Sequence, residues 1–450
     1  MSLTFFLLRR SNPAGKEHPL LQIYKKKGHR VERMTLQVNS SFSIRVASGI
    51  VALLTGSLAC AQQNYTYATV PANDDVVTPY AQYSITYDDN VLRLRDAAQA
   101  QSVMGSDRMA DSYSTTVGGL RINKLLGRQR FTIDASANRT KFDNFSAFDN
   151  DGKDLKANWS WVAGRFLSGG LGYVYSQALT PFQNFRVFER NIRTTRSKFA
   201  SVGLKMHPDW TLRALFTQLS LGYSIPSQQV NMFTQNISEL GLDYTPRSGS
   251  TVGLQARHTV GNYPYSTSIN GVLVNNSFTQ DELKAKVLWL YSGKTRLQFL
   301  GGMVDRKRQS GGSTNYSGFN ARLIADWLAT GKTSFSMNLW REIGGLNDVD
   351  ANYALTNGVS LAATLASSDK LRFDGLVDYE KRNFNGAVLI QGLTPSGRRD
   401  KYERASFSVT YMPTSSLSLV AAIYRENLQS NIDSFAYVSN GVSLTTRYEF

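Results

Sequence analysis

The chain has 450 residues, with 50 lysines and arginines against 34 aspartates and glutamates, four histidines and one cysteine. Its formal net charge of +16 raises the question of nucleic-acid binding, but after residue 61 the charges are spread along the chain and no basic run is longer than three residues. One cysteine excludes a disulfide framework within the chain. No stretch after residue 61 has the 18 or more apolar residues that a membrane helix needs.

Residues 34–61 have the pattern of a secretory signal peptide. Arg45 precedes a short apolar run over 46–58, and Ala59, Cys60 and Ala61 form a small-x-small cleavage site. The run is too short to span a bilayer. We therefore predict cleavage after Ala61.

Residues 1–33 are not expected to belong to this signal. They hold a basic cluster, Lys25 to Lys27, that ordinary signal peptides lack, so the predicted translation start is Met34. Cys60 is expected to be removed with the signal peptide, and the alternative is that Cys60 carries a lipid. Removing residues 1–61 takes away nine Lys and Arg and two Asp and Glu, which leaves 389 residues with a net charge of +9.

The rest of the chain is expected to be strand-rich. Residues 62–79, with Pro71 and Pro79, are predicted to be a flexible periplasmic lead-in. From 80 to 450, segments with period-2 alternation are bounded by turn-forming residues, which indicates strands. Eighteen candidates are near 80–88, 113–123, 129–142, 153–164, 167–178, 192–206, 209–223, 236–245, 250–262, 278–292, 294–305, 315–328, 333–344, 352–366, 369–384, 400–412, 416–427 and 438–450.

The connections between these strands alternate in length. Short ones such as 207–208, 292–293 and 367–368 lie between long ones such as 89–112 and 385–399. Alternating short turns and long loops are typical of outer-membrane barrels, whereas a soluble sandwich has no reason for them. The predicted fold class is all-β, a transmembrane antiparallel up-and-down barrel over 80–450 with about 18 strands. Counts of about 16 to 20 stay open, because boundaries read from one sequence err by several residues.

The last thirteen residues, 438–450, support this fold. Apolar and polar side chains alternate strictly along them, and the chain ends on an aromatic residue, Phe450. We predict that this strand closes the barrel against the strand near Tyr80, contacts membrane lipid and is recognised by the barrel-assembly machinery. The expected location is the outer membrane of a Gram-negative bacterium.

The face predicted to line the lumen carries a modest excess of basic over acidic residues. Such a wall favours anions through its summed field, while mutually neutralising ion pairs would leave little preference, and we hold both interpretations open. The predicted lumen residues are Arg130, Lys156, Arg257, Lys284, Lys286, Arg322, Arg372, Arg382, Arg404 and Arg447.

Two loop motifs are candidate ligand sites. Phe182, Phe185 and Phe188 repeat every third residue, a pattern that suits sugar contact but is also typical of a loop that packs on itself. Packing is the favoured interpretation. The acidic loop 149–154 resembles a calcium loop but lacks the remaining EF-hand ligands, so no metal and no cofactor is predicted.

Catalysis has little support in the sequence. After residue 61 only His207 and His258 remain, and neither lies in a metal-ligand or nucleophile motif. We predict that the protein is not an enzyme. A lipid hydrolase that uses His258 is the minority alternative.

Several short motifs of the chain resemble the EpsL-type proteins, which are outer-membrane proteins of exosortase B-associated exopolysaccharide gene clusters. These motifs are Tyr87 to Asn90 with Val91 to Arg95, the run from Ser114 to Arg139, Asn144 to Ser146, and Asn191 to Thr195. They are structural, so the resemblance carries over no catalytic or ligand residue.

The resemblance implies a role in the synthesis or export of extracellular polysaccharide. Polysaccharide and other export components are then the expected partners, and nucleic acid is not. A general or anion-preferring diffusion porin is the alternative, followed by a structural or assembly-factor barrel that transports nothing.

Overall fold

The computed structural model describes residues 76–183, 188–269, 272–274, 276–309, 315–344, 351–387 and 397–450, and three short strands before them. The chain divides into two compact units. In the first, β1 (Phe5–Leu8), β2 (Leu20–Lys27) and β3 (Arg30–Met34) pair antiparallel. The predicted cleavage site and most of the predicted lead-in fall in residues 35–75, which lie outside the described residues.

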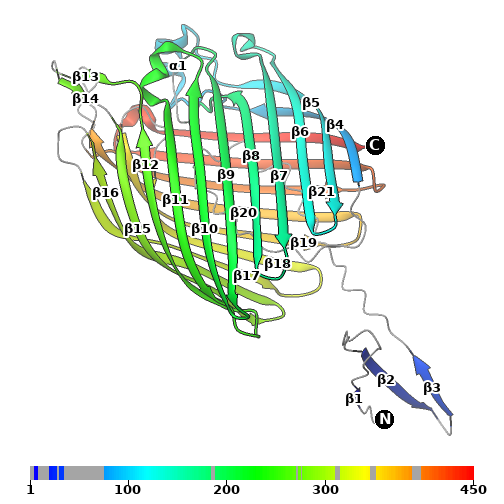
Figure 1. Cartoon of the computed structure of the whole chain (residues 1–450). Helices are drawn as coiled ribbons and strands as arrows, with labels where there is room; N and C mark the ends of the chain where they lie inside the picture. The colour runs from blue at the N-terminus through cyan, green and yellow to red at the C-terminus, as the bar shows by residue number, and fades with distance from the viewer. Residues whose placement is uncertain are drawn as a thin grey trace. The chain divides into compact units, whose positions relative to one another are not determined.

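The second unit is a closed barrel in which each strand pairs antiparallel with both neighbours (Figure 1). Eighteen of the described strands form it, so the predicted fold class is confirmed. They are β4 (Val76–Asp88), β5 (Asp111–Leu126), β6 (Gln129–Phe142), β7 (Asn150–Ala163), β8 (Leu167–Leu179), β9 (Ile192–His207), β10 (Trp210–Tyr223), β11 (Phe233–Tyr244), β12 (Thr251–Asn262), β15 (Phe278–Ser292), β16 (Thr295–Arg308), β17 (Tyr316–Leu328), β18 (Thr333–Gly344), β19 (Ala351–Ala366), β20 (Leu371–Ala387), β21 (Arg399–Tyr411), β22 (Leu417–Ser430) and β23 (Tyr437–Glu449).

The barrel closes between its last strand and its first. Pairs such as Val442 with Tyr87 and Leu444 with Ile85 join β23 to β4. All four side chains are exposed, as is Phe450 at 72%. Because successive residues of a strand point to opposite faces, this row of exposed apolar side chains defines the outward face, and the residues between them point inward.

Short turns join the strands at one end of the barrel and longer connections at the other (Figure 1). The long connections hold short elements that the sequence patterns do not predict. These are α1 (Ala97–Met104), η2 (Ser146–Phe148), η3 (Pro226–Asn231), the hairpin β13 (Thr267–Ile269) with β14 (Val272–Val274), and η4 (Asp433–Phe435). By the usual arrangement of such barrels, the short turns are periplasmic and the long connections face outside the cell.

One detail departs from the sequence-based expectation. β4 begins at Val76, so residues 76–79 of the expected lead-in are strand, and the carbonyl of Pro79 accepts a hydrogen bond from the Phe450 N–H. On β10, Arg213 and Leu215 share the inward face, because Leu215 pairs with Glu239 and Arg213 with Gly241 on the inward side of β11. The apolar Leu215 therefore lines the interior.

The outward face is apolar from the periplasmic turns upward and then becomes charged. On β20 it runs from Leu371 through Val377 to Tyr379 and then meets Lys381. About nine residues suffice for a tilted strand to cross the hydrocarbon layer. Exposed ring pairs near the turns, such as Tyr448 with Phe450, suit an interfacial aromatic girdle. The barrel is built for the Gram-negative outer membrane.

Among the described residues, no helix is long and apolar enough to cross a membrane.

Candidate functional site: a loop held inside the barrel

The inner wall of the barrel is lined with charged side chains. The strand register places all ten predicted lumen residues on the inward face; on β20, for example, Arg372 and Arg382 alternate with the outward Val377. Aspartates and glutamates share this face. Whether the wall attracts anions therefore depends on how many of the basic groups have acidic partners.

Most of these basic groups do have acidic partners. Arg322 forms a bidentate pair with Glu342, with N–O distances of 3.0 and 2.7 Å. The other pairs are Arg257 with Glu239 at 2.9 Å, Lys286 with Asp243 at 3.0 Å, Arg372 with Asp374 at 2.8 Å, Arg382 with Glu380 at 2.6 Å, Arg404 with Glu426 at 3.9 Å, Arg447 with Glu449 at 3.1 Å, and Lys284 with Glu282. The pairs cancel much of the field that the basic residues alone would produce.

Lys156 differs from these paired residues. It is exposed on the inward face of β7, opposite Asp134 of β6 and Val174 of β8. Within the part of the chain that the structure describes, its ammonium group forms no ion pair. Among the ten predicted residues, it is the clearest source of an uncompensated positive charge facing the lumen.

The connection between β4 and β5, residues 89–110, is called the inner loop below, because its first residues contact inward-facing residues at the outer end of the barrel. Its first part is buried, with Leu92 and Leu94 both at 0% exposure. Between them Arg93 has a φ of 57°, the left-handed conformation that residues with a Cβ disfavour. A strained residue between two buried leucines indicates that contacts elsewhere hold this turn in place.

Ion pairs of Arg93 supply those contacts. Its Nη1 lies 2.7 Å from Oδ2 of Asp88, and its Nε lies 3.2 Å from Oε2 of Glu426 on the inward face of β22. All three side chains are almost fully buried. Burial alone would lower the pKa of Arg93, but the attraction of both carboxylates raises it well above its ordinary range, so the guanidinium stays charged.

Polar neighbours complete the pairing around Asp88 and Arg93. The Asp88 carboxylate also accepts hydrogen bonds from the Tyr424 hydroxyl at 2.5 Å and the Ser439 hydroxyl at 2.7 Å. Asn90 donates from Nδ2 to the carbonyls of Leu94 and Val438, at 2.6 and 2.9 Å. The inner loop is therefore tied to β22 and β23 through buried polar groups whose partners are more than 300 residues away in sequence.

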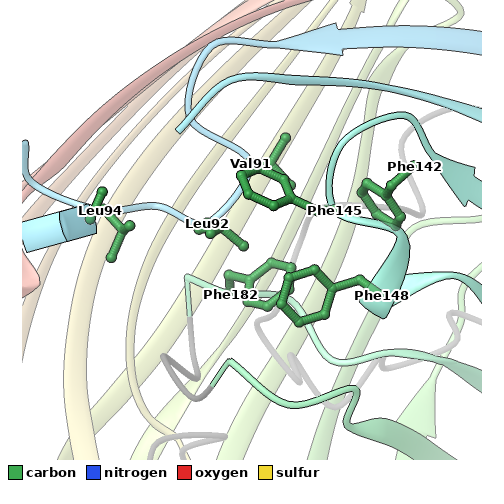
Figure 2. Close-up of a cluster of buried hydrophobic side chains, with 8 residues drawn as sticks. Val91, Leu92, Leu94, Phe142, Phe145, Phe148 and Phe182 are labelled. Carbon is green, nitrogen blue, oxygen red and sulfur yellow. The ribbon is translucent and has the colours of Figure 1, made fainter. Parts of the chain in front are cut away.

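A hydrophobic cluster covers the other side of the inner loop (Figure 2). Phenylalanines from the connections 143–149 and 180–191 pack on it, with Phe148 edge-on to Phe182 at 4.9 Å between ring centroids. The labelled members are Val91, Leu92, Leu94, Phe142, Phe145, Phe148 and Phe182. This cluster joins three connections into one packed body at the outer end of the barrel.

The cluster bears on the loop aromatics, for which packing is the favoured interpretation of the sequence. Phe182 is only 7% exposed and Phe188 is partly buried against the same cluster, whereas Phe185 lies outside the described residues. Little of the Phe182 ring is open to a sugar, because Phe148 and its neighbours cover it. Packing accounts for the positions of Phe182 and Phe188.

Two aspartates fix the conformation of the connection 143–149 through hydrogen bonds. Asp111 accepts hydrogen bonds from the backbone N–H groups of Asn144 and Phe145 at 3.0 and 2.9 Å, and Asp149 accepts one from Phe142 at 2.8 Å. The Asp149 carboxylate thus stabilises the turn after β6. Among the described residues, no group of three or more His, Cys, Asp or Glu side chains is placed to hold a metal ion.

His258, the candidate of the hydrolase alternative, points outward from β12 and not into the lumen. Its Nδ1 lies 2.6 Å from Oδ1 of Asp281, and both side chains are more than half exposed on the outer surface.

Sequence reasoning missed the central residues of this site, Arg93 and Glu426. One signal was present, since three apolar residues, Val91, Leu92 and Leu94, closely follow the turn-forming Asp89 and Asn90. Apolar side chains inside a long loop indicate that the loop packs against something.

No family model and no curated protein sequence matches the chain. Solved structures do resemble it. OccK2 (OpdF) of Pseudomonas aeruginosa aligns with a TM-score of 0.44 and 11% identity over 83% of this chain and 98% of its own. The outer membrane protein OpdK of the same species gives 0.43 and 11% over 83% and 98%, and OccAB3 of Acinetobacter baumannii gives 0.42 and 11% over 83% and 99%. At this level of identity the likeness concerns only the fold.

Proposed function

We infer that the protein is a diffusion porin of the outer membrane, in which the inner loop narrows a water-lined passage for small solutes. The observation that carries this proposal is the buried bridge from Arg93 to Asp88 and Glu426, which fixes a loop inside a barrel with a charged inner wall. Barrels of about 16 to 18 strands are wide enough for an aqueous channel. A loop folded into such a barrel sets the width of the passage.

The passage has a weak preference for anions. Most basic groups of the wall have acidic partners, so the summed field is small, and Lys156 supplies an uncompensated positive charge. A modest positive potential in a channel with low-dielectric walls raises the local concentration of anions. This proposal favours the porin alternative of the sequence analysis over polysaccharide export, which stays a prediction that no contact described above supports.

Planar-bilayer recordings of the purified protein test the proposal. In a salt gradient the reversal potential should indicate a small preference for chloride over potassium, and Lys156→Gln should reduce it. Lys156→Arg, which keeps the positive charge at this position, is the matched control and should leave the reversal potential unchanged. A wild-type channel selective for cations would contradict the anion preference, and the absence of any conductance would contradict the porin.

A further inference from the structure

Two grooves on the outward face of the barrel have the same construction but oppositely charged rims. The first crosses β16 to β20 and has a volume of about 410 Å³. The second crosses β11 to β17 and has a volume of about 570 Å³. Both lie where the apolar belt ends and polar side chains begin, the depth at which lipid headgroups meet acyl chains.

The floor of the first groove is one continuous apolar row. The register pairs Phe299 with Leu323, Leu323 with Leu339, Leu339 with Val359, and Val359 with Tyr379, so five neighbouring strands contribute side by side. Ala321, the next outward residue of β17 after Leu323, leaves the row open toward the long connections. An acyl chain fits such a floor because it needs only apolar contact.

The rim of the first groove carries two cations. The register pairs Arg341 with Asn357 and Asn357 with Lys381, two residues nearer the outer end than the apolar row. Both basic side chains are exposed, and Arg341 donates from Nη1 to Oδ1 of Asn357 at 2.9 Å. In the described part of the chain neither forms an ion pair, in contrast to the paired arginines of the inner wall.

The second groove differs mainly in its rim. Its apolar row runs through Leu240, Ala256, Leu283 and Met303, and the row above it runs through Ser238, His258, Asp281 and Asp305. Asp305 pairs there with Lys307 at 3.3 Å and Asp281 with His258 at 2.6 Å, so this rim offers a phosphate no unpaired cation and two carboxylates that repel it. If apolar surface alone selected a ligand, the two grooves would be equivalent, so any difference between them must come from the rim charges.

We propose that the groove under Arg341 and Lys381 binds an outer-leaflet lipid with a phosphate headgroup. The guanidinium and the ammonium hold the phosphate, the Asn357 amide lies between them, and an acyl chain lies along the row from Leu323 to Val359. Arginine matches phosphate geometry with parallel N–H donors, and lysine adds a point charge. The apolar floor directly below the cations points to a lipid and not to free phosphate.

Photocrosslinking of the full-length barrel in detergent tests this site. The probe is phosphatidic acid with a diazirine on its acyl chain, and the readout is the crosslink yield on β17 to β19 against probe concentration. Arg341→Gln with Lys381→Gln should weaken the apparent affinity there about thirtyfold, because each cation near a lipid headgroup contributes about 1 kcal/mol. Arg139→Gln with Lys153→Gln, outward cations of β6 and β7, should leave the yield unchanged.

Two further measurements separate lipid from free phosphate. Ala321→Phe fills the groove without changing its charge and should weaken the binding of phosphatidic acid. Inorganic phosphate, added at the same concentration as the probe, should not displace it. A second probe, a diacylglycerol with the same diazirine, lacks the phosphate and should label both grooves equally. Unchanged crosslinking in the Arg341 and Lys381 variant, or equal labelling of both grooves by phosphatidic acid, would overturn the proposal.

Discussion

Replacing Arg93 by alanine is expected to release the inner loop from the barrel wall. The change leaves the carboxylates of Asp88 and Glu426 without the cation that lies 2.7 and 3.2 Å from them. Removing one partner of a buried ion pair costs about 3–5 kcal/mol, because the remaining charge stays buried. The equilibrium between docked and released loop should therefore shift by about two to four orders of magnitude.

Backbone strain gives a second, smaller effect that can be separated from the first. Alanine keeps the unfavourable left-handed φ of 57°, which costs about 1–2 kcal/mol for a residue with a Cβ, whereas glycine does not. Arg93→Gly should thus lose the same ion pairs but retain the docked loop better than Arg93→Ala, by about 1 kcal/mol.

Single-channel recording and hydrogen exchange measure the release. We expect larger conductance steps in Arg93→Ala than in the wild type, and loss of amide protection at Val91 and Leu94, whose N–H groups are hydrogen-bonded in the docked loop. Arg425→Ala is the control, since Arg425 adjoins Glu426 but points outward and donates to Asn440. Unchanged conductance together with unchanged protection in Arg93→Ala would refute the reasoning.

The other predictions concern the wall, the cluster and the helix of the inner loop. Lys156→Glu should shift the reversal potential toward cations more than Lys156→Gln does, and equal shifts would show that Lys156 does not face the permeating ions. Phe148→Ala removes a ring that is 1% exposed and should cost about 3–5 kcal/mol of cluster stability, seen as faster hydrogen exchange in 143–149; unchanged exchange would contradict the packing. Asp96 caps α1 by accepting a hydrogen bond from the Gln99 N–H, which lowers the pKa of the Asp96 carboxyl. The cap therefore stabilises the helix fully at pH values above the ordinary carboxyl pKa, and this stabilisation is lost as the pH falls through the lowered pKa. Exchange in 97–104 should accelerate in that acidic window, and Asp96→Asn, which caps without titrating, should remove the pH dependence.

The barrel itself could be predicted because its signal is local. Each strand shows its two faces through alternation, as Leu371 to Tyr379 do on β20, and turn residues mark the ends. The closing strand could likewise be matched with the first strand near Tyr80, since a barrel leaves no edge unpaired. None of these inferences needs the position of a distant side chain.

The site could not be predicted because its contacts are not local. Whether Arg322 faces Glu342 or open water depends on the register between β17 and β18, which the alternation of either strand leaves undetermined. The bridge from Arg93 to Glu426 joins residues 333 apart. A loop that leaves its own strands and crosses to another part of the wall has no periodic signal in the sequence.

Liposome swelling with solutes of increasing size tests the central claim most directly. In proteoliposomes of the wild type, small organic acids and monosaccharides should enter and larger oligosaccharides should not, because the inner loop narrows the passage. Arg93→Ala should raise the size limit. Entry of no solute through either protein, or an equal size limit for both, would contradict a passage set by the inner loop.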